Sequence, residues 1–283
     1  MESRTLISIV IPSRDIASSS GVQQLFDDIS EQYMQMGIEV CQVEAVSPAG
    51  KARNIGAEKA KGEILVFVDE DIRLGNKYVL NNLIEALLND KKIGVVSAAI
   101  RIPEDATKFE RRYAKEIPHC ESPIVDQQLD VWVATSACCA VRKDVFLEVG
   151  KFNGYIPRGQ DPEFSYRIRN KGYRTVLAPQ TWCYHPVPKN IRELARLQSR
   201  NGRSTAAVDV HYPQLNVNIN PKGIIYPSKQ RNIIHRGLRF VWSFFKACIR
   251  GKTLLVTAKL IYFLGYSHGI LVNTIRKITR RYH

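Results

Sequence analysis

The chain has 283 residues, of which 45% are hydrophobic and 24% charged, a composition typical of a globular protein with one large domain or two smaller ones. Its six cysteines form no CxxC pair, which excludes a metal finger and indicates reduced thiols in the cytoplasm. The formal net charge is +14, and the excess is C-terminal: residues 1–209 carry 28 basic and 27 acidic side chains, whereas residues 210–283 carry 13 basic side chains and no acid.

Strand and helix patterns alternate along the first hundred residues. Short apolar, β-branched runs predict strands at Leu6–Ile11, Ile38–Val43, Ile64–Val68 and Ile93–Ile102. Helical spacing predicts helices between them at 21–36, Ala49–Ala60 and Tyr78–Leu88. This alternation favours an α/β fold with a mostly parallel sheet and helices on both faces. Right-handed crossovers then bring the loops after the first three strands to one edge of the sheet.

The next hundred residues are less regular. Residues 103–130 are polar and irregular, and an apolar segment follows at Val131–Val141. The later elements predicted are two helices and a strand, at Arg142–Val149, Phe164–Asn170 and Tyr173–Ala178. The segment Ser-Arg-Asn-Gly-Arg predicts a mobile loop that carries Arg200 and Arg203, because Gly202 allows unusual backbone angles.

A basic amphipathic helix is predicted from about Arg231. On a helical wheel its apolar arc holds Leu238, Val241, Trp242, Phe244, Phe245, Cys248 and Ile249. The opposite arc holds Arg239, Ser243, Lys246 and Arg250. This pattern is expected of a helix that lies in the membrane interface.

Residues 253–275 are apolar all round, and their length could just span a bilayer. Lys259 would cost about 2.5–3.5 kcal/mol at mid-membrane, which favours a re-entrant or interfacial placement over a spanning one. The alternative is that this helix and the one before it pack on the domain or form a dimer. The absence of acidic residues from 210–283 favours membrane association over both alternatives.

Asp69-Glu70-Asp71 ends the predicted strand Ile64–Val68. Residues i and i+2 of a strand share a side, so Asp69 and Asp71 can project together. Two neighbouring carboxylates repel unless a cation lies between them, and their oxygens suit Mg²⁺ or Mn²⁺. Because open α/β sheets place ligands at the carboxyl ends of strands, the feature predicts a metal-bound phosphorylated ligand. The alternative is an ordinary acidic strand cap.

Four sequence motifs follow one another along the chain: Ile7–Arg14 (ISIVIPSR), Gly50–Gly56 (GKARNIG), Gly62–Asp71 (GEILVFVDED) and Gly159–Arg167 (GQDPEFSYR). Their order and spacing resemble those of inverting family-2 glycosyltransferases over residues 5–190. The resemblance implies the GT-A fold, a Rossmann-like, mostly parallel mixed sheet with helices on both faces. We expect a glycosyltransferase domain over residues 1–205 and a basic, membrane-associating helical region over residues 206–283.

The resemblance also implies a nucleotide-sugar site at the strand ends. Its donor-binding residues would be Pro12, Arg14, Asp15, Glu44, Lys51, Arg53, Asn54 and Asp69. Glu44 stands where the family usually has an Asp that contacts the base. A guanidinium such as that of Arg53 pairs well with phosphate or carboxylate, and an ordinary surface helix residue is the alternative. Arg203, in the predicted loop, would close over the diphosphate.

The same resemblance assigns the metal ligands. Asp71 would bind Mn²⁺ or Mg²⁺ directly, with Asp69 nearer the ribose and sugar. His185 would be an additional ligand, because several relatives carry a His at this place. A structural His beside aromatic residues is the alternative.

Asp161 matches the catalytic base of the family. An inverting transfer needs one carboxylate to take a proton from the acceptor hydroxyl as that hydroxyl attacks the anomeric carbon. Gln160 stands where the family commonly has Glu, and it removes a negative charge that would raise the pKa of Asp161. Glu163 is the alternative base, and a charge at the helix N-terminus is its other role.

We therefore expect an enzyme that moves a sugar from a nucleotide-diphosphate donor to a glycan or polyprenyl-linked acceptor, as in cell-surface polysaccharide or glycoconjugate assembly. It would work in the cytoplasm, peripheral or monotopic on the inner membrane face, because no signal-peptide pattern opens the sequence. The expected partners are donor, acceptor and an anionic membrane contacted through residues 231–283, with no nucleic acid; a homo-oligomer is compatible with the sequence.

Two other functions stay open at this point. A nucleotidyltransferase of related α/β fold would need a Gly-rich, Lys-containing loop after Val10, and this chain lacks it. A non-enzymatic, basic membrane-binding protein would leave the four ordered motifs unexplained.

Overall fold

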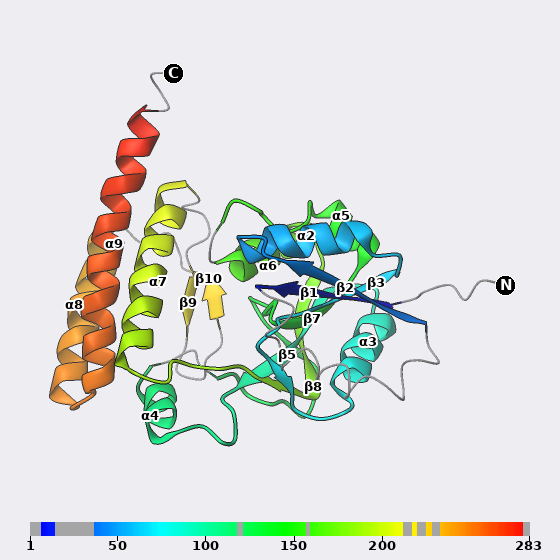
Figure 1. Ribbon diagram of the computed structural model, residues 1–283, viewed down its shortest axis with the longest axis horizontal. Coiled ribbons are helices and arrows are strands. Elements are labelled where there is room, and N and C mark those ends of the chain that lie inside the picture. The colour runs from blue at the N-terminus through cyan, green and yellow to red at the C-terminus, as the bar shows by residue number, and fades with distance from the viewer. Residues whose placement is uncertain are drawn as a thin grey trace. The chain divides into compact units, whose positions relative to one another are not determined.

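The computed structural model describes residues 7–14, 37–117, 121–156, 159–211, 217–219, 225–227 and 233–279. The predicted helix at 21–36 lies outside these residues. The chain forms two compact units (Figure 1). The sheet unit comprises Met1–Pro103 and Glu121–Pro186, and the helical unit comprises Glu104–Cys120 and Val187–His283. The expected division after residue 205 stays a prediction.

The sheet unit is built on one mixed sheet of eight strands in the order β2-β1-β3-β7-β5-β8-β4, with β6 paired to β8. The strands are β1 (Ile7–Ser13), β2 (Ile38–Glu44), β3 (Ile64–Val68), β4 (Arg73–Leu74), β5 (Ile93–Arg101), β6 (Leu129–Asp130), β7 (Cys138–Arg142) and β8 (Arg174–Tyr184). Strands β1, β2, β3, β5 and β8 share one direction, and β7 runs against both of its neighbours. The expected α/β sheet is confirmed.

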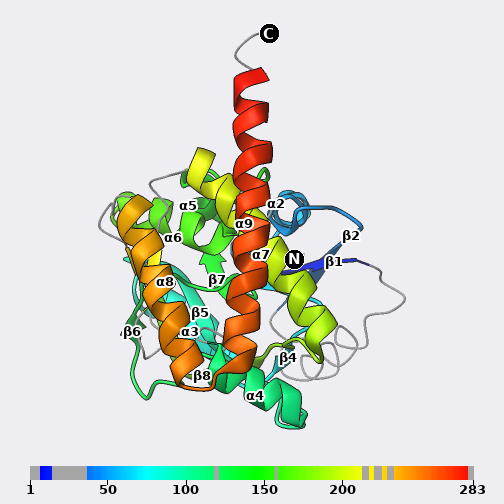
Figure 2. The ribbon, with the colours of Figure 1, turned by 90° about the vertical axis from the view of Figure 1, so that its left-hand side faces the viewer.

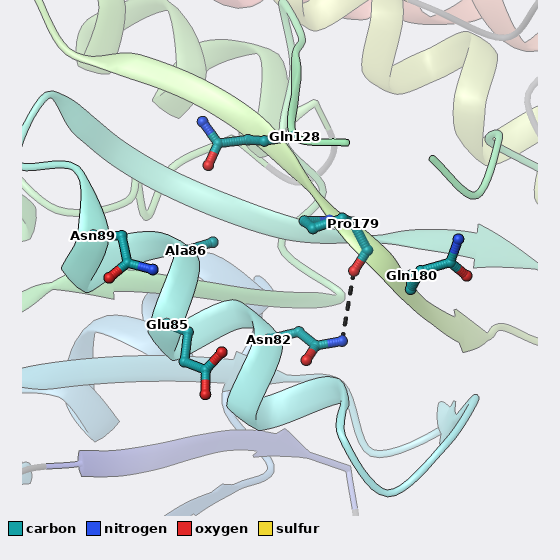
Figure 3. Close-up of a pocket in the computed structure, with 7 residues that line it drawn as sticks. All are labelled: Asn82, Glu85, Ala86, Asn89, Gln128, Pro179 and Gln180. Carbon is teal, nitrogen blue, oxygen red and sulfur yellow. Dashed lines mark hydrogen bonds between the residues drawn. The ribbon is translucent and has the colours of Figure 1, made fainter. Parts of the chain in front are cut away.

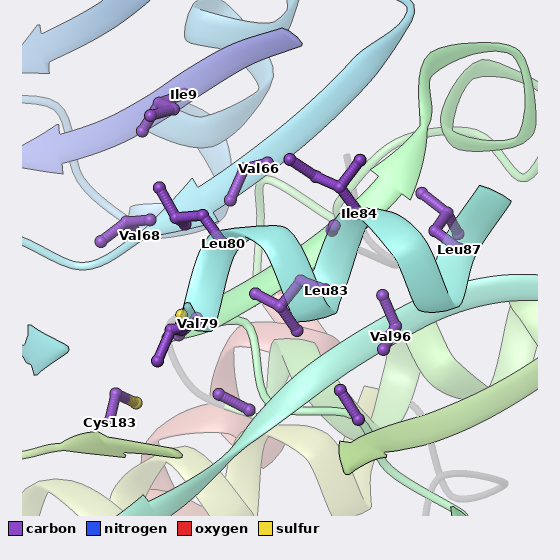
Figure 4. Close-up of a cluster of buried hydrophobic side chains, with 14 of the residues drawn as sticks. Ile9, Val66, Val68, Val79, Leu80, Leu83, Ile84, Leu87, Val96 and Cys183 are labelled. Atoms are coloured by element: carbon purple, nitrogen blue, oxygen red, sulfur yellow. The ribbon is translucent and has the colours of Figure 1, made fainter. Parts of the chain in front are cut away.

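Side-chain alternation in the central strands builds a hydrophobic core on each face of the sheet. Ile9, Val66 and Val68 face α3 (Val79–Asn89), whose buried stripe is Val79, Leu80, Leu83, Ile84 and Leu87 (Figure 4). On the other face Phe67 packs against Phe146 and Phe152, which in turn pack against Phe164, with ring centroids 4.5–5.7 Å apart within this cluster. The helices there are α2 (Ala49–Lys59), α5 (Lys143–Glu148) and α6 (Gln160–Asn170).

Two helices arise where the sequence predicts irregular chain. Helix α4 (Lys108–Glu116) lies in the polar segment 103–130 and begins with a capping box, in which Thr107 and Glu110 satisfy each other's backbone N–H groups. Helix α7 (Ile191–His211) contains Arg200, Gly202 and Arg203, so the mobile-loop prediction is wrong. Most of the stability of a helix such as α7 comes from tertiary packing rather than from local propensity, so sequence patterns alone do not reveal it.

The helical unit contains α4, α7, α8 (Ile233–Ile249), α9 (Thr253–Thr279) and a small ladder of β9 (Val217–Ile219) with β10 (Ile225–Pro227). Helices α7 and α9 lie side by side (Figures 1 and 2) and approach through glycines. A Cβ atom on Gly202 would collide with the backbone of Tyr262 and Tyr266, and one on Gly265 would collide with the backbone of Ser199. Gly202 therefore serves close helix packing, not loop flexibility.

This packing gives a test with a matched control. Gly202→Ala is expected to lower the free energy of unfolding by about 1–3 kcal/mol, because the added methyl forces the two backbones apart. Gly237→Ala in α8 has no atom of the described residues within 4 Å of the added Cβ and is expected to raise stability by up to about 1 kcal/mol. Thermal unfolding of both variants measures the difference. Equal melting temperatures would contradict the close approach of α7 and α9.

Candidate functional site

Asp69, Asp71 and His185 come together at the carboxyl end of the sheet, although more than a hundred residues separate His185 from the two aspartates along the chain. Asp69 and Asp71 follow β3, and His185 follows β8, which runs in the same direction. One ligand atom from each lies within 4.8 Å of the others, and His185 Nε2 is 3.9 Å from Asp71 Oδ1. The group can hold a divalent cation.

The ring of His185 is oriented by its neighbours. Its backbone N–H donates to the carbonyl of Arg101 at 2.9 Å, which extends the β5–β8 ladder. Its Nδ1 lies 2.9 Å from the carbonyl oxygen of Pro186. Because a carbonyl only accepts, Nδ1 is the donor in this contact, and Nε2 is the ring nitrogen that faces Asp71. Metal-binding histidines are commonly held by such a second contact.

The charges of the group also fit a cation. Desolvation by the surrounding protein raises the pKa of Asp71, nearby His185 opposes this, and the Asp69 carboxylate adds to it. A bound cation would reverse the effect of the paired carboxylates. Two carboxylates and one imidazole therefore offer a donor set that Mn²⁺ or Mg²⁺ can take.

Arg53 links this group to the start of α6. It lies on α2 with only 4% of its surface exposed, and its guanidinium forms an ion pair with Asp69. Its Nη1 donates to Gln160 Oε1 at 3.2 Å, while its buried Nε has no hydrogen-bond partner in the described part of the chain. Burial lowers the pKa of Arg53, but the carboxylates of Asp69 and Asp161 outweigh it and leave that pKa raised. The surface-residue alternative is therefore excluded by its burial.

Arg53→Met is expected to lower the free energy of unfolding by about 2–4 kcal/mol. Removing one partner of a buried ion pair costs about 3–5 kcal/mol, and the loss here is smaller because Asp69 keeps 25% of its side chain exposed. Arg53→Lys keeps the charge but cannot bind Asp69 and Gln160 together, so its free energy of unfolding should lie between those of Arg53→Met and the native chain. Urea unfolding measures all three; a Lys variant as unstable as Met would contradict the charge argument.

Asp161 lies in the first turn of α6, directly after Gly159 and Gln160. Gly159 has φ +86°, a conformation that glycine adopts freely and that starts the helix abruptly. The hydroxyl of Ser136 donates to Asp161 Oδ1. Burial raises the pKa of Asp161, and Arg53 and Ser136 oppose the shift. A carboxylate with a raised pKa is a stronger base than an ordinary Asp.

Glu163, the alternative base, is already engaged. Both of its oxygens accept from Arg167, one turn along α6, at 2.6 and 2.7 Å. Arg167 also donates to the carbonyls of Val149 and Lys151. Glu163 is 7% exposed, so its carboxylate is held in a structural clamp. The geometry favours Asp161.

Glu70 points away from the cation group, toward β1. It accepts from the hydroxyl of Ser13 at 2.7 Å and from the backbone N–H of Arg14 at 2.9 Å. The guanidinium of Arg14 lies 3.9 Å from the same carboxylate. Glu70 therefore ties the end of β1 and Arg14 to the acidic segment, a positioning role that no sequence pattern predicts.

The other predicted donor residues occupy varied places. Pro12 lies in β1, Glu44 ends β2, and Lys51 is exposed on α2. Asn54 exchanges two hydrogen bonds with the backbone of Phe152, at 2.8 and 3.0 Å. Two predicted residues fall elsewhere: Asp15 lies outside the described residues, and Arg203 belongs to the helical unit, where its Nη1 is 3.2 Å from Ser199 Oγ. Their binding roles stay predictions.

A separate hollow of about 340 Å³ lies beside α3 (Figure 3). Its lining is rich in amides: Asn82, Glu85, Ala86, Asn89, Gln128, Pro179 and Gln180. None of the predicted site residues lines it. It therefore does not belong to the group at the carboxyl end of β3.

Known proteins resemble this chain in sequence and in fold. The family described as "Glycosyltransferase like family 2" matches residues 3–204. The chain is similar to glycosyltransferase AglE of Haloferax volcanii, with 24% identity over 196 residues that cover 69% of this chain and 62% of that protein. It is also similar to the O-antigen biosynthesis protein RfbC of Myxococcus xanthus, with 27% identity over 149 residues that cover 47% of this chain and 12% of that protein. It thus spans less than two thirds of either relative.

Among solved structures, the chain is similar to the mannosyltransferase PcManGT of Pyrobaculum calidifontis, solved with GDP-Man and Mn²⁺. The TM-score is 0.55 at 15% sequence identity, and the match covers 94% of this chain and 86% of that one. At this identity the likeness concerns the fold alone. It confirms the expected GT-A fold.

Proposed function

The chain belongs to the glycosyltransferase-like family 2, and on that premise we propose that it is a metal-dependent inverting glycosyltransferase. It moves a sugar from a nucleotide-diphosphate donor to a glycan or polyprenyl-linked acceptor at the cytoplasmic membrane face. The observation that carries the proposal is the convergence of Asp69, Asp71 and His185 at the carboxyl end of the sheet, joined through Arg53 to the segment that holds Asp161.

In this proposal Asp161 is the catalytic base. Its carboxylate takes the proton of the acceptor hydroxyl, whose oxygen forms the new bond to the anomeric carbon. The bond from that carbon to the donor phosphate breaks on the opposite side, and the nucleoside diphosphate leaves. Burial of Asp161 supports this role through its raised pKa, and the Ser136 hydroxyl fixes the orientation of the carboxylate.

Asp71, Asp69 and His185 would hold Mn²⁺ or Mg²⁺. When bound, the cation neutralises negative charge that develops on the leaving diphosphate. Arg53 orients the carboxylate of Asp69 through their ion pair, and Arg14, tied to Glu70, stands directly after β1, where the nucleotide would lie. The identity of the cation at such oxygen-rich sites follows from availability as much as from affinity.

Two similar proteins support the acceptor class. AglE is named a glycosyltransferase and RfbC an O-antigen biosynthesis protein, and O-antigens are surface glycans. The C-terminal helices add a membrane argument: α9 is long and apolar enough to cross a bilayer by length and composition, and the last 74 residues carry no acid. We therefore propose an acceptor assembled at an anionic membrane surface, in cell-surface polysaccharide or glycoconjugate biosynthesis.

A donor panel tests the reaction. UDP-, GDP- and dTDP-sugars are added to the full chain with and without Mn²⁺, and the melting temperature is followed. We expect one nucleotide class to raise it, and only with the cation. Proton NMR of slow donor hydrolysis should then show the released sugar first as the anomer opposite to that of the donor. A released sugar of retained configuration would overturn the inverting mechanism, and no nucleotide response would overturn the enzyme class.

A further inference from the structure

Helix α9 raises a question of topology. Thr253–Lys277 is long and apolar enough to cross a membrane, and only 17% of its most apolar window is buried in the protein. A spanning helix is surrounded by lipid or by other apolar helices over its whole length. The neighbours of α9 within the helical unit therefore decide whether it can span.

Helix α7 accompanies α9 along the full candidate span. At the start, Leu194 packs in one cluster with Leu254 and Ala258. At the middle, Gly202 and Gly265 let the two backbones touch. Further contacts continue to the end: Gly269 against Ala206, the Tyr266 hydroxyl donating to Asp209 at 2.8 Å, and Lys277 Nζ 3.4 Å from the carbonyl of Val210.

These neighbours are too polar for the hydrocarbon region. Helix α7 carries six charged side chains: Arg192, Glu193, Arg196, Arg200, Arg203 and Asp209. Each would cost about 2.5–3.5 kcal/mol at mid-membrane. The first turn of α9 is also tied to the charged helix α4, where Glu116 accepts from the N–H of Leu255 at 3.2 Å and Arg112 donates to Thr253. A helix fastened to α7 and α4 cannot be surrounded by lipid.

The side of α9 away from α7 is apolar and exposed. Its exposed large side chains are Leu260, Phe263, Leu264, Leu271 and Ile275, each 50–67% exposed. Their spacing places them on one stripe of the helix, opposite the buried residues Leu254, Ala258, Gly265 and Gly269. These side chains form an exposed apolar stripe along α9.

Helix α8 presents a second exposed stripe. Its members are Leu238, Val241, Trp242, Phe245 and Ile249, between 49% and 86% exposed. The helix packs on α9 through other residues: the rings of Phe240 and Phe263 lie 5.8 Å apart, and Lys259 Nζ lies 5.0 Å from the Phe240 ring. Lys259 thus points at an aromatic ring of α8, and this contact offsets part of the cost predicted for a lysine in lipid.

The charge beside these stripes identifies the partner. Arg239, Lys246 and Arg250 follow the α8 stripe along one side, and Arg276 and Lys277 close α9. Residues 210–283 contain no acid that would repel an anionic headgroup. Each basic residue near an anionic membrane contributes about 1 kcal/mol. Apolar stripes flanked by basic residues fit a membrane surface rich in anionic lipid.

We propose that α8 and α9 lie flat in the interface of an anionic membrane, that their two exposed stripes enter one leaflet, and that α9 does not span the bilayer. The protein is monotopic, and α7 stays in water as the strut behind α9. This inference rests on the membrane attachment proposed above but not on the proposed reaction, so the two can fail separately.

Depth measurements test the flat placement. Nitroxide labels are attached at Leu264→Cys and Ile275→Cys of the full chain, in a Cys120→Ser, Cys248→Ser background, with vesicles of phosphatidylglycerol and phosphatidylcholine. A flat helix places both labels at the same shallow depth. A spanning helix places them about 16 Å apart along the membrane normal, with Leu264 near the midplane, because the rise is 1.5 Å per residue. A label at Arg196→Cys on α7 should stay in water. The proposal would be overturned by a lipid-exposed label at Arg196→Cys, or by a label at Leu264→Cys near the bilayer midplane.

A binding measurement tests the stripe itself. Trp242→Ala with Phe245→Ala is expected to weaken partition onto the same vesicles at least about tenfold, since two exposed aromatic side chains that would enter the lipid are lost. Leu88→Ala with Leu147→Ala removes two apolar side chains of the sheet unit, 60% and 49% exposed, and should leave partition unchanged. Equal binding by the two double variants would overturn the proposal. A second result would also overturn it: native protein that does not bind vesicles but forms an oligomer, which the Trp242→Ala, Phe245→Ala variant does not form. The stripe would then bind a second copy of the chain. Donor-dependent melting shifts should be unchanged in both variants.

Discussion

Asp161→Asn is expected to lower kcat for sugar transfer by about 10²–10⁴-fold, the range that a positioned general base contributes. Donor binding should be retained, because Asp161 lies in α6 beside Ser136 and takes no part in the group of Asp69, Asp71 and His185. The measurement is a transfer assay combined with donor titration by melting temperature. Loss of both transfer and donor binding would contradict the assignment of Asp161 as the base.

The same substitution has a predicted effect on stability, and its sign follows from the pKa. Burial raises the pKa of Asp161 above its value in the unfolded chain, so folding favours the protonated carboxyl. That contribution is fully present below the ordinary pKa of Asp and is lost as the pH rises through the raised value. At neutral pH Asp161→Asn should therefore be as stable as the native chain or more stable. In the native enzyme the rate should fall with decreasing pH at a point above the ordinary Asp pKa.

Glu163→Gln is the matched control for the base. It breaks the clamp between Glu163 and Arg167, so it should lower the melting temperature while leaving kcat within about tenfold of the native value. If Glu163→Gln lost transfer and Asp161→Asn kept it, the base would be Glu163. The two variants therefore separate a structural carboxylate from a chemical one within a single turn of α6.

Asp71→Ala is expected to abolish both metal-dependent transfer and the rise in melting temperature that Mn²⁺ gives with the donor. Asp71 is half-exposed at the end of β3 and shares its neighbourhood with Asp69 and His185, so its removal takes one of three ligand atoms. The loss of a ligand should weaken metal binding by at least about tenfold, since even outer contacts of a metal site cost 10–100-fold. Calorimetric titration with Mn²⁺ measures this directly.

Glu70→Gln is the control for Asp71, one residue away. Glu70 contacts Ser13 and Arg14 rather than the cation group, so its variant should keep the response to Mn²⁺. It should weaken donor binding modestly, because the loop after β1 loses its anchor. A metal response that survives in Asp71→Ala, or that disappears in Glu70→Gln, would contradict the arrangement of this acidic segment.

Local patterns predict the strands of the sheet well because their signals are short-range. The β-branched runs at Ile38, Ile64 and Ile93 begin where β2, β3 and β5 begin. The carboxylates after β3 follow from strand alternation alone, and the structure brings His185 to them as the resemblance implies. Such patterns do not predict which residues distant in the sequence contact one another. Ser136 beside Asp161 is a serine before a strand, with no feature that marks it.

In the helical unit, contacts between distant residues also override a local pattern. Gly202 and the arginines around it were expected in a loop, because glycine in a polar segment is a strong turn signal. Their helix packs against α9 at glycines of both helices: Gly202 meets the backbone of Tyr262 and Tyr266, and Gly265 meets the backbone of Ser199. Likewise, the apolar arc of α8 is predicted correctly as a stripe, but only the structure shows that it faces outward.

The antiparallel strand β7 has a consequence for how such a chain can vary. The N–H of Asp69 donates to the carbonyl of Ala137 at 2.8 Å, so the polypeptide leaves the site after β3 and returns to the same place before β7. The chain from Ile72 to Thr135 therefore begins and ends close to this hydrogen bond. Insertions or deletions within it can alter β4, α3 or α4 without changing the span between the carboxylates of Asp69 and Asp71 and the hydroxyl of Ser136. The two halves of the site are thus insulated from length changes in the segment that separates them.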